Sequence, residues 1–236
     1  MPQQVLLDRS GRKVYLAVIL ILGCTPPAGP LVPLDAAPVS PEQVQGWVGA
    51  TIPRESALHQ FKWLFRNDRS SAGGVGRIRI AAPDTLRLDA RGPLGSGRMA
   101  AVVVGERSVW AEPEDQVAQI VPDYTLLWAM FGVARLPARG ATLRGIDNDQ
   151  LTSWEYAFGG DTVAYARTKG EPARFSAEVR RRGRLFGRVV TRLSANGQPV
   201  SARLTVPDVP AQLDINFVST TAQSAFPPET WLPPEP

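Results

Sequence analysis

Cysteine and histidine, which often perform catalysis or bind transition metals, each occur once in the 236-residue chain, as Cys24 and His59. A lone cysteine cannot form an internal disulfide, and a cysteine-based zinc site needs several thiolates. One histidine argues equally against multi-histidine metal sites and against a serine–histidine triad. No nucleophile elbow, phosphate loop or HxxxH pair occurs either. We therefore expect no catalytic residues, no metal site and no cofactor, and hence no enzyme.

The remaining polar clusters have simpler structural interpretations. Asp147 and Asp149 could bind a hard cation, but a turn explains an isolated Asp-Asn-Asp sequence better. The acids on either side of Pro113 could act as an acid–base pair, although a loop accounts for them as well. The arginine-rich stretch at 180–184 is expected to be a solvated turn, with attraction to anionic lipid head groups as the alternative. A net charge of +4 spread over the chain is too weak to indicate nucleic acid.

The residues before Cys24 have the organisation of an export signal. A positive stretch, Arg9 to Lys13, precedes an uncharged apolar run at residues 14–22. This run is too short to cross a membrane as a helix, which takes about 20 residues, but it has the length of the apolar region of a secretory signal.

The end of this run, Leu22-Gly23-Cys24, resembles the bacterial lipobox. That resemblance implies that a diacylglyceryl group is attached to the Cys24 sulfur and that cleavage occurs before this residue, so residues 1–23 would be a lipoprotein signal peptide. Acyl groups would then hold the chain on a membrane surface, with each buried CH₂ adding about 0.8 kcal/mol. An ordinary signal peptide and a buried free cysteine are the alternative interpretations.

Proline-rich segments bound the expected domain, which covers residues 41–220. Residues 24–40 are expected to form a semi-extended tether, and residues 221–236 an extended tail that lies on the domain or dangles from it. No second apolar run of 18 residues occurs, so no other segment is predicted to span a membrane.

Most of the domain has the period-two alternation of β-strands, as where Phe61, Trp63 and Phe65 alternate with Lys62, Leu64 and Arg66. Glycine-containing turns, such as Arg182-Gly183 and Asn196-Gly197, connect these stretches as hairpins. About 10–11 short strands predict a mainly β (α+β) fold, a strongly curved antiparallel half-barrel with short helices lidding its concave face.

Two helices are predicted among the strands. Ser40 can cap a helix that starts at Pro41 and is ended by Pro53. A second helix, over residues 122–132, is apolar nearly all round and stops at Gly132. Such a helix must be covered on both sides or must itself cover an apolar surface, so we expect it to plug or lid the sheet, although a plain core helix would look the same.

One apolar face of the sheet would line its interior if the strands pair as their alternation suggests. The pattern does not separate a hollow, ligand-binding interior from a packed core, and both remain open. The residues predicted to line this cavity come from the sheet and from the second helix. They are Phe61, Trp63, Phe65, Ile78, Ile80, Leu86, Leu88, Val102 and Val104 in the strands, and Leu127, Trp128 and Phe131 in the helix.

Three stretches carry a resemblance to a known family. They are Phe61-Lys62-Trp63 with the following Leu86 to Gly95, Leu127 to Gly132 with Leu136-Pro137, and Trp154-Glu155-Tyr156 with the strands up to Pro207. Their order and spacing, over residues 41–218, resemble LolB-type outer-membrane lipoprotein receptors and the wider set of LolA/LolB-like lipid carriers.

The resemblance implies an unclosed, curved sheet with helices over an apolar cavity that accepts acyl chains of lipoproteins or lipids. Receptor members are themselves lipoproteins and pass other lipoproteins into the outer membrane. We accordingly expect a monomer anchored to the periplasmic face of the outer membrane rather than the inner one, supplied by a periplasmic carrier protein. In such receptors a Pro-Leu-Gly loop presents a leucine that assists membrane insertion. That role would fall to Leu94, unless this leucine packs under its own hairpin.

Two classes of function are therefore compatible with the sequence. The first is a carrier or receptor that holds an acylated ligand in an apolar cavity and helps to deliver it to the outer membrane. The second is a structural or assembly lipoprotein that binds a protein partner and has a filled, ligand-free core.

The substitution Cys24→Ser should leave the domain folded and detach it from membranes, because it removes the only sulfur that can carry an acyl anchor. Fractionation of cells that express the variant, followed by a carbonate wash of the membranes, checks this. A variant that stays with the washed membranes would show that the anchor lies elsewhere.

Overall fold

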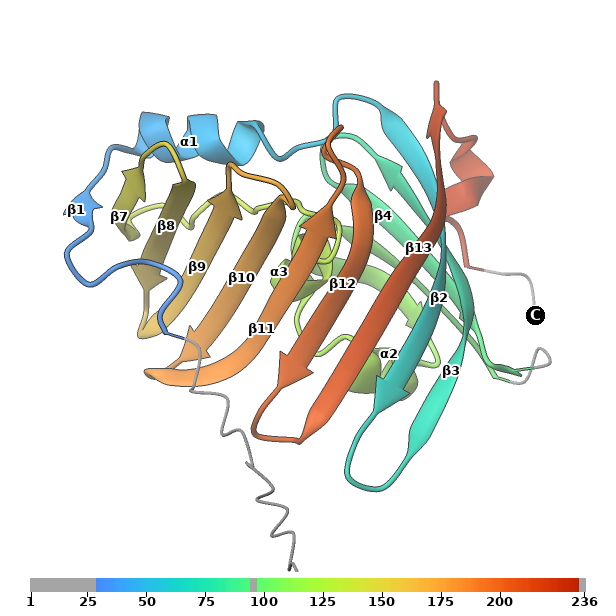
Figure 1. The fold of residues 1–236 in the computed structure, drawn as a ribbon. Coiled ribbons are helices and arrows are strands. Elements are labelled where there is room, and N and C mark those ends of the chain that lie inside the picture. The colour runs from blue at the N-terminus through green and yellow to red at the C-terminus, as the bar shows by residue number, and fades with distance from the viewer. Residues whose placement is uncertain (1–28, 94–96, 234–236) are drawn as a thin grey trace, which may run out of the picture.

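The chain folds around one open antiparallel sheet, shown in Figure 1. The computed structural model describes residues 29–93 and 97–233, and within them the sheet has 13 strands in the order β1-β7-β8-β9-β10-β11-β12-β13-β2-β3-β4-β5-β6. The strands are β1 (Ala37–Pro38), β2 (Ser56–Arg66), β3 (Ser71–Ala81), β4 (Thr85–Arg91), β5 (Arg98–Val104), β6 (Arg107–Glu112), β7 (Thr142–Asp147), β8 (Leu151–Phe158), β9 (Asp161–Thr168), β10 (Arg174–Arg181), β11 (Arg184–Leu193), β12 (Pro199–Val206) and β13 (Ala211–Gln223). The helices are α1 (Pro41–Gly49), α2 (Glu114–Ile120) and α3 (Tyr124–Ala129), with a 3-10 helix at Pro228–Trp231.

The predicted fold class, a mainly β half-barrel with a few short helices, is confirmed. The hairpin turns also occur where they were predicted: Arg182 and Gly183 have φ angles of 51° and 80°, and Gly197 has a φ of 78°. Two strands, β1 and β7, were not predicted. The first has only two residues, and the second contains Gly145 and lacks a clear apolar alternation, so neither has a strong sequence signal.

Both predicted helices are present, and a side chain caps each of them, Ser40 as expected and Asp123 in addition. The Ser40 hydroxyl accepts a hydrogen bond from the Gln43 amide (3.2 Å) at the start of α1, which ends at Gly49, ahead of Pro53. The Asp123 carboxylate accepts one from the Leu126 amide (3.1 Å) at the start of α3.

The interpretation of the acids around Pro113 as part of a loop is wrong, because α2 begins directly after this proline. Glu114 and Asp115 lie in the first turn of α2, where negative charge favours a helix N-terminus.

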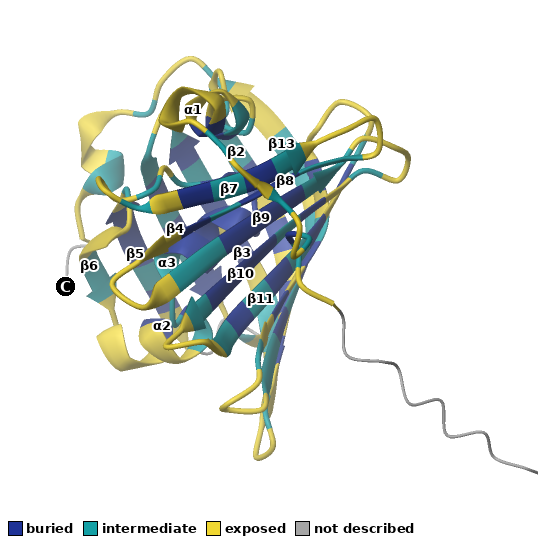
Figure 2. Cartoon of the chain, turned by 90° about the vertical axis from the view of Figure 1, so that its left-hand side faces the viewer, coloured by how far each residue is buried: buried dark blue, intermediate teal, exposed yellow. Residues whose placement is uncertain are grey.

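Pairing between β2 and β13 joins the start of the domain to its end. Trp63 lies opposite Ile215 and Phe65 opposite Leu213, so apolar side chains from both strands share one face. We call this the inner face, because α3 packs against it (Figure 1). A Cβ atom at Gly76 of β3 would lie only 2.3 Å from the Phe61 ring, so the bare backbone lets this ring lie flat against the sheet. Figure 2 shows buried residues running along the strands at the centre of the molecule.

Both ends of the described chain pack on the opposite, outer face. The segment expected to be a tether lies on the sheet from Gly29 onward: the Gly29 carbonyl accepts a hydrogen bond from Arg188 (3.0 Å), and Val32 is 1% exposed. The tail lies on the domain as far as it is described, since the Trp110 indole donates to the Trp231 carbonyl (2.9 Å).

His59 is buried on the inner face, next to α3. Its ring centroid lies 5.5 Å from that of Phe131 and 5.7 Å from that of Phe217, and its Nδ1 is 2.9 Å from the Thr220 hydroxyl. Burial among these rings lowers the pKa of His59 from 6.5 to about 4, because it disfavours the charged imidazolium.

The free energy of unfolding should fall as the pH falls through the window from 6.5 to about 4, because only the unfolded chain then binds a proton at His59. The loss should reach up to about 3 kcal/mol and be absent above pH 6.5. Urea unfolding at pH 4.5, 5.5 and 7.5 measures it. The control is His59→Gln, which removes the only histidine and should show a flatter profile over this window. Parallel pH profiles for the two chains would contradict the assignment.

Candidate functional site

The inner face brings together most of the residues predicted to line a cavity. They come from three neighbouring strands and from the α3 segment, and all are buried in one apolar cluster. These residues are Phe61, Trp63 and Phe65 of β2, Ile78 and Ile80 of β3, Leu86 and Leu88 of β4, and Leu127, Trp128 and Phe131 in or after α3.

The placement of Val102 and Val104 in this cavity is wrong. Val103 pairs with Leu86 and points to the inner face, so its neighbours Val102 and Val104 point outward, and Val104 is exposed. The apolar residues of β5 run Met-Ala-Ala-Val-Val-Val without a polar residue between them, so the sequence does not show which alternate positions face the core.

Helix α3 fills the space under the sheet. Leu126, Leu127, Trp128 and Met130 are each at most 2% exposed. The helix approaches β11 closely at Gly187, where a Cβ atom would lie 2.6 Å from Cδ1 of Leu126. Any larger residue at this position would therefore collide with the end of the Leu126 side chain, which would have to shift.

Hydrogen bonds to the surrounding frame position α3. The Trp128 indole donates to the Gly105 carbonyl (2.6 Å), and the Thr191 hydroxyl of β11 donates to the Ala129 carbonyl (2.8 Å). At the start of the helix, Thr125 donates to Glu106 (2.9 Å). Arg181 of β10 also pairs with Asp123, the N-cap of the helix (3.1 Å), and the Arg135 guanidinium lies 5.1 Å from the centre of the Trp128 ring. The other buried side chains of α3 make apolar contacts, which have no preferred partner.

Aromatic side chains of β8, β9 and β10 complete the far wall of the inner face. Tyr165 lies between Trp154 and Phe175, with ring centroids 5.3 and 5.7 Å away. Its hydroxyl accepts a hydrogen bond from the Arg135 amide (3.1 Å), and burial raises the pKa values of both Tyr165 and Tyr156, so each stays neutral. The strands themselves were predicted, and the alternation from Trp154 to Tyr156 was the signal that could have placed these side chains on the wall.

Two indole N–H groups on this face have no hydrogen-bond partner within the described parts of the chain. Nε1 of Trp63 and Nε1 of Trp154 are both buried. A buried donor without an acceptor costs about 1–3 kcal/mol, so a ligand oxygen that reached either group would be bound more tightly than its apolar part alone. The inner face can thus hold apolar groups and can meet a carbonyl oxygen at two positions.

Two predicted functional residues, Cys24 and Leu94, lie outside the described residues, as does the signal peptide. Within residues 29–93 and 97–233, no three His, Cys, Asp or Glu side chains are grouped so that they could hold a metal ion. No helix in the described chain combines the length and apolarity needed to cross a membrane.

Neither a protein-family model nor a curated protein sequence matches this chain. Among solved structures, the chain is similar to the LolA superfamily protein NE2245 from Nitrosomonas europaea, with a TM-score of 0.53 and 10% identity over 83% of this chain and 98% of that one. It is also similar to an outer membrane lipoprotein-sorting protein domain from Vibrio parahaemolyticus, with a TM-score of 0.46 and 9% identity over 81% and 97% of the two chains. At this identity the likeness concerns architecture: the chain has a LolA-like fold.

Proposed function

We propose that this chain is a membrane-anchored lipoprotein that binds an acylated ligand, either a lipoprotein or a lipid, on the inner face of its sheet and helps to deliver it to the outer membrane. The observation that carries the proposal is the cover of that face, the six residues of α3, whose buried side chains are almost all apolar. Such a cover occupies the place that an acyl chain would take. The LolA-like fold supports the same role.

Binding requires α3 to move, and this sets a lower limit on ligand length. Exposing three large apolar side chains, such as Leu126, Leu127 and Trp128, would cost roughly 5–9 kcal/mol. Each CH₂ of the ligand that becomes buried contributes about 0.8 kcal/mol of favourable binding free energy. A chain of about ten carbons would therefore be needed to displace the helix, so the closed form favours long acyl chains over short ones.

The unpaired indole of Trp63 supports an acyl ligand rather than a plain hydrocarbon. An ester or amide carbonyl next to the acyl chain is an acceptor for a buried N–H donor, and pairing removes the penalty of leaving Nε1 unpaired.

The remaining parts of the proposed role concern the membrane. A lipid on Cys24 would hold the domain at the periplasmic face of the outer membrane, a periplasmic carrier protein would supply the cargo, and Leu94 would enter the bilayer during transfer. Such a role consists of binding and release and needs no catalysis.

A second function is favoured by one observation, the burial of every residue of α3 after Tyr124. Leu126, Trp128 and Met130 have no exposed surface, as in an ordinary packed core. In that case the chain would be a structural or assembly lipoprotein that binds a protein partner through its surface.

A valine at Gly187 should separate these functions, because its side chain would collide with Leu126 and loosen α3. In a carrier, Gly187→Val should lower the melting temperature and raise the affinity for a fluorescent palmitoyl probe several-fold, since a larger fraction of molecules is open. The control is Val32→Ala on the outer face, which shortens a side chain that is 1% exposed and lies outside the inner-face cluster. It should lower the melting temperature without changing probe affinity.

Chain length gives the second arm of the experiment. A palmitoyl probe should bind the unmodified domain and an octanoyl probe should bind far more weakly. If neither the unmodified domain nor the Gly187→Val variant binds the palmitoyl probe, the carrier function is wrong and the filled-core function stands.

A further inference from the structure

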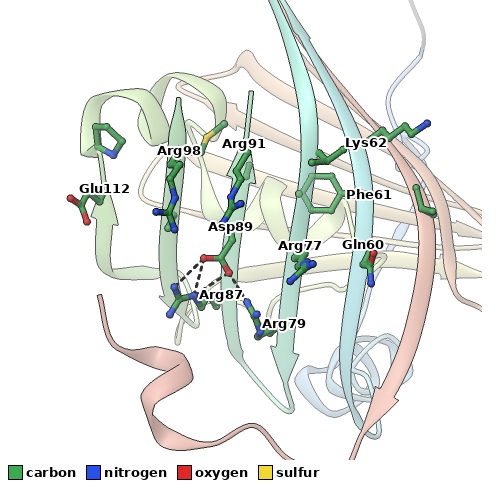
Figure 3. Close-up of a pocket in the computed structure, with 17 residues that line it drawn as sticks. Gln60, Phe61, Lys62, Arg77, Arg79, Arg87, Asp89, Arg91, Arg98 and Glu112 are labelled. Atoms are coloured by element: carbon green, nitrogen blue, oxygen red, sulfur yellow. Dashed lines mark hydrogen bonds and ion pairs between the residues drawn. The ribbon is translucent and has the colours of Figure 1, made fainter. Parts of the chain in front are cut away.

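The outer face of the sheet carries a groove of about 700 Å³ that crosses β2, β3, β4 and β5, shown in Figure 3. Its charged side chains alternate along the strands with core residues, so they point away from α3. Pro113, next to α2, and Val218 of β13 bound it at its two sides. Phe61, Ala90 and Met99 border the groove and also belong to the inner-face cluster, so the groove and the proposed acyl site lie on opposite faces of the same strands.

The lining of the groove is strongly cationic. It contains six basic side chains, Lys62, Arg77, Arg79, Arg87, Arg91 and Arg98, against two acidic ones, Asp89 and Glu112. The difference, six minus two, is a local charge of +4, equal to the formal net charge of the whole chain. The net positive charge is therefore concentrated here, because the basic and acidic residues in the rest of the chain are equal in number.

Only part of this charge is neutralised within the protein. Asp89 accepts hydrogen bonds from Arg79 (2.6 Å) and Arg87 (3.0 Å), as the dashed lines in Figure 3 show. Arg87 also donates to the Thr230 carbonyl of the tail (2.5 Å).

The other four cations lack such partners. Lys62, Arg77, Arg91 and Arg98 have neither an ion pair nor a side-chain hydrogen bond with any residue that the structure describes, and all four are exposed.

The strand register forces three of these free cations into one row. Val75 of β3 pairs with Lys62 on one side and with Arg91 on the other, and Arg91 pairs with Arg98. Neighbouring strands are about 4.8 Å apart, so the row extends about 14 Å across four strands. Like charges directly opposite one another destabilise a sheet, so Arg91 and Arg98 do not stabilise this fold. A bound anion would remove that repulsion.

This row lies at the end of the sheet where the anchored segment would meet the membrane. Because neighbouring strands are antiparallel, the β4–β5 and β10–β11 turns lie at the same end, the lower end in Figure 1. Arg91 and Arg98 are the last pair before the first of these turns, and Gly29 is bound by Arg188 close to the second. Four residues separate Cys24 from Gly29, and the five Cα–Cα steps between these two residues span at most about 17 Å.

We propose that the groove binds the phosphate groups of anionic phospholipids at the bilayer surface and so holds the domain with its β4–β5 end toward the lipid. The head-group site rests on the groove alone, whereas its orienting role rests on the proposed anchor at Cys24. Val75, which is 55% exposed, lies between the cations in the row. An apolar side chain flanked by cations suits the boundary between head groups and acyl chains better than it suits an acidic polypeptide.

Co-flotation with vesicles tests the proposal on residues 25–236, which contain every residue the structure describes and lack the apolar run at 14–22. The chain should bind vesicles of phosphatidylcholine and phosphatidylglycerol (7:3) but not pure phosphatidylcholine, and less in high salt. Each cation contributes about fivefold to partitioning, so Lys62→Gln/Arg91→Gln/Arg98→Gln should weaken binding roughly a hundredfold. Its melting temperature should stay the same or rise, because a like-charge pair is removed.

The matched control removes the same charge from the opposite end of the sheet. Arg54, Arg107 and Arg174 are exposed, precede or begin strands at that end, and have no side-chain partner among the described residues. Arg54→Gln/Arg107→Gln/Arg174→Gln should reduce binding far less than the groove variant. An equal loss in both variants, or no preference for anionic vesicles, overturns the proposal. Binding to polyglutamate but not to vesicles overturns it in favour of an acidic protein partner. Palmitoyl-probe affinity, measured on the same chains, reports the acyl site separately.

Discussion

An open curved sheet cannot bury its own inner face, and this constraint determines most of the remaining structure. A closed barrel covers its interior with its own strands, whereas here the order runs from β1 to β6 without closure among the described residues. Helix α3 provides the missing cover, and its apolar composition, its close approach at Gly187 and its bond from Thr191 all follow from that task. In the proposed function, whatever replaces α3 must be apolar as well, and an acyl chain meets this requirement.

Strand alternation places two chemically different surfaces on the same stretch of chain. In β2, Phe61 and Trp63 point inward while Lys62, between them, points into the outer groove. The inner surface attracts by burial of apolar area, which salt does not weaken, and the outer one by exposed charge, which salt screens. A register shift of one residue would exchange both surfaces at once, so the pairing of β2 with β13 and β3 protects two sites together.

The sequence was sufficient for those parts of the fold that depend on local rules. Ser40 and Asp123 are recognisable caps, and the alternation of Phe61, Trp63 and Phe65 identifies the inner positions of β2. Prediction failed at Val102 and Val104, because an unbroken run of apolar residues does not show which positions face inward. It also failed at α2, because the acidic residues around Pro113 were interpreted as a loop.

The outer groove could not have been found from the sequence alone. Its cations are scattered from position 62 to position 98, and only the pairing of β2, β3, β4 and β5 gathers them into a row. The packed state of the inner face likewise depends on how α3 docks, which involves residues as far apart as Leu126 and Gly187.

The two borders of the sheet, as far as the structure describes the chain, have a consequence for association between molecules. A border strand with unpaired backbone groups can recruit the same strand of another molecule, and a sheet of 13 strands would then grow into a polymer. One border, β1, has two residues, of which Pro38 has no N–H to offer. The other, β6, has six residues, begins with Arg107 and ends with Glu112, and its Trp110 is already bound by the tail. Neither border is a long, flat template, so the sheet can stay open without joining its neighbours edge to edge.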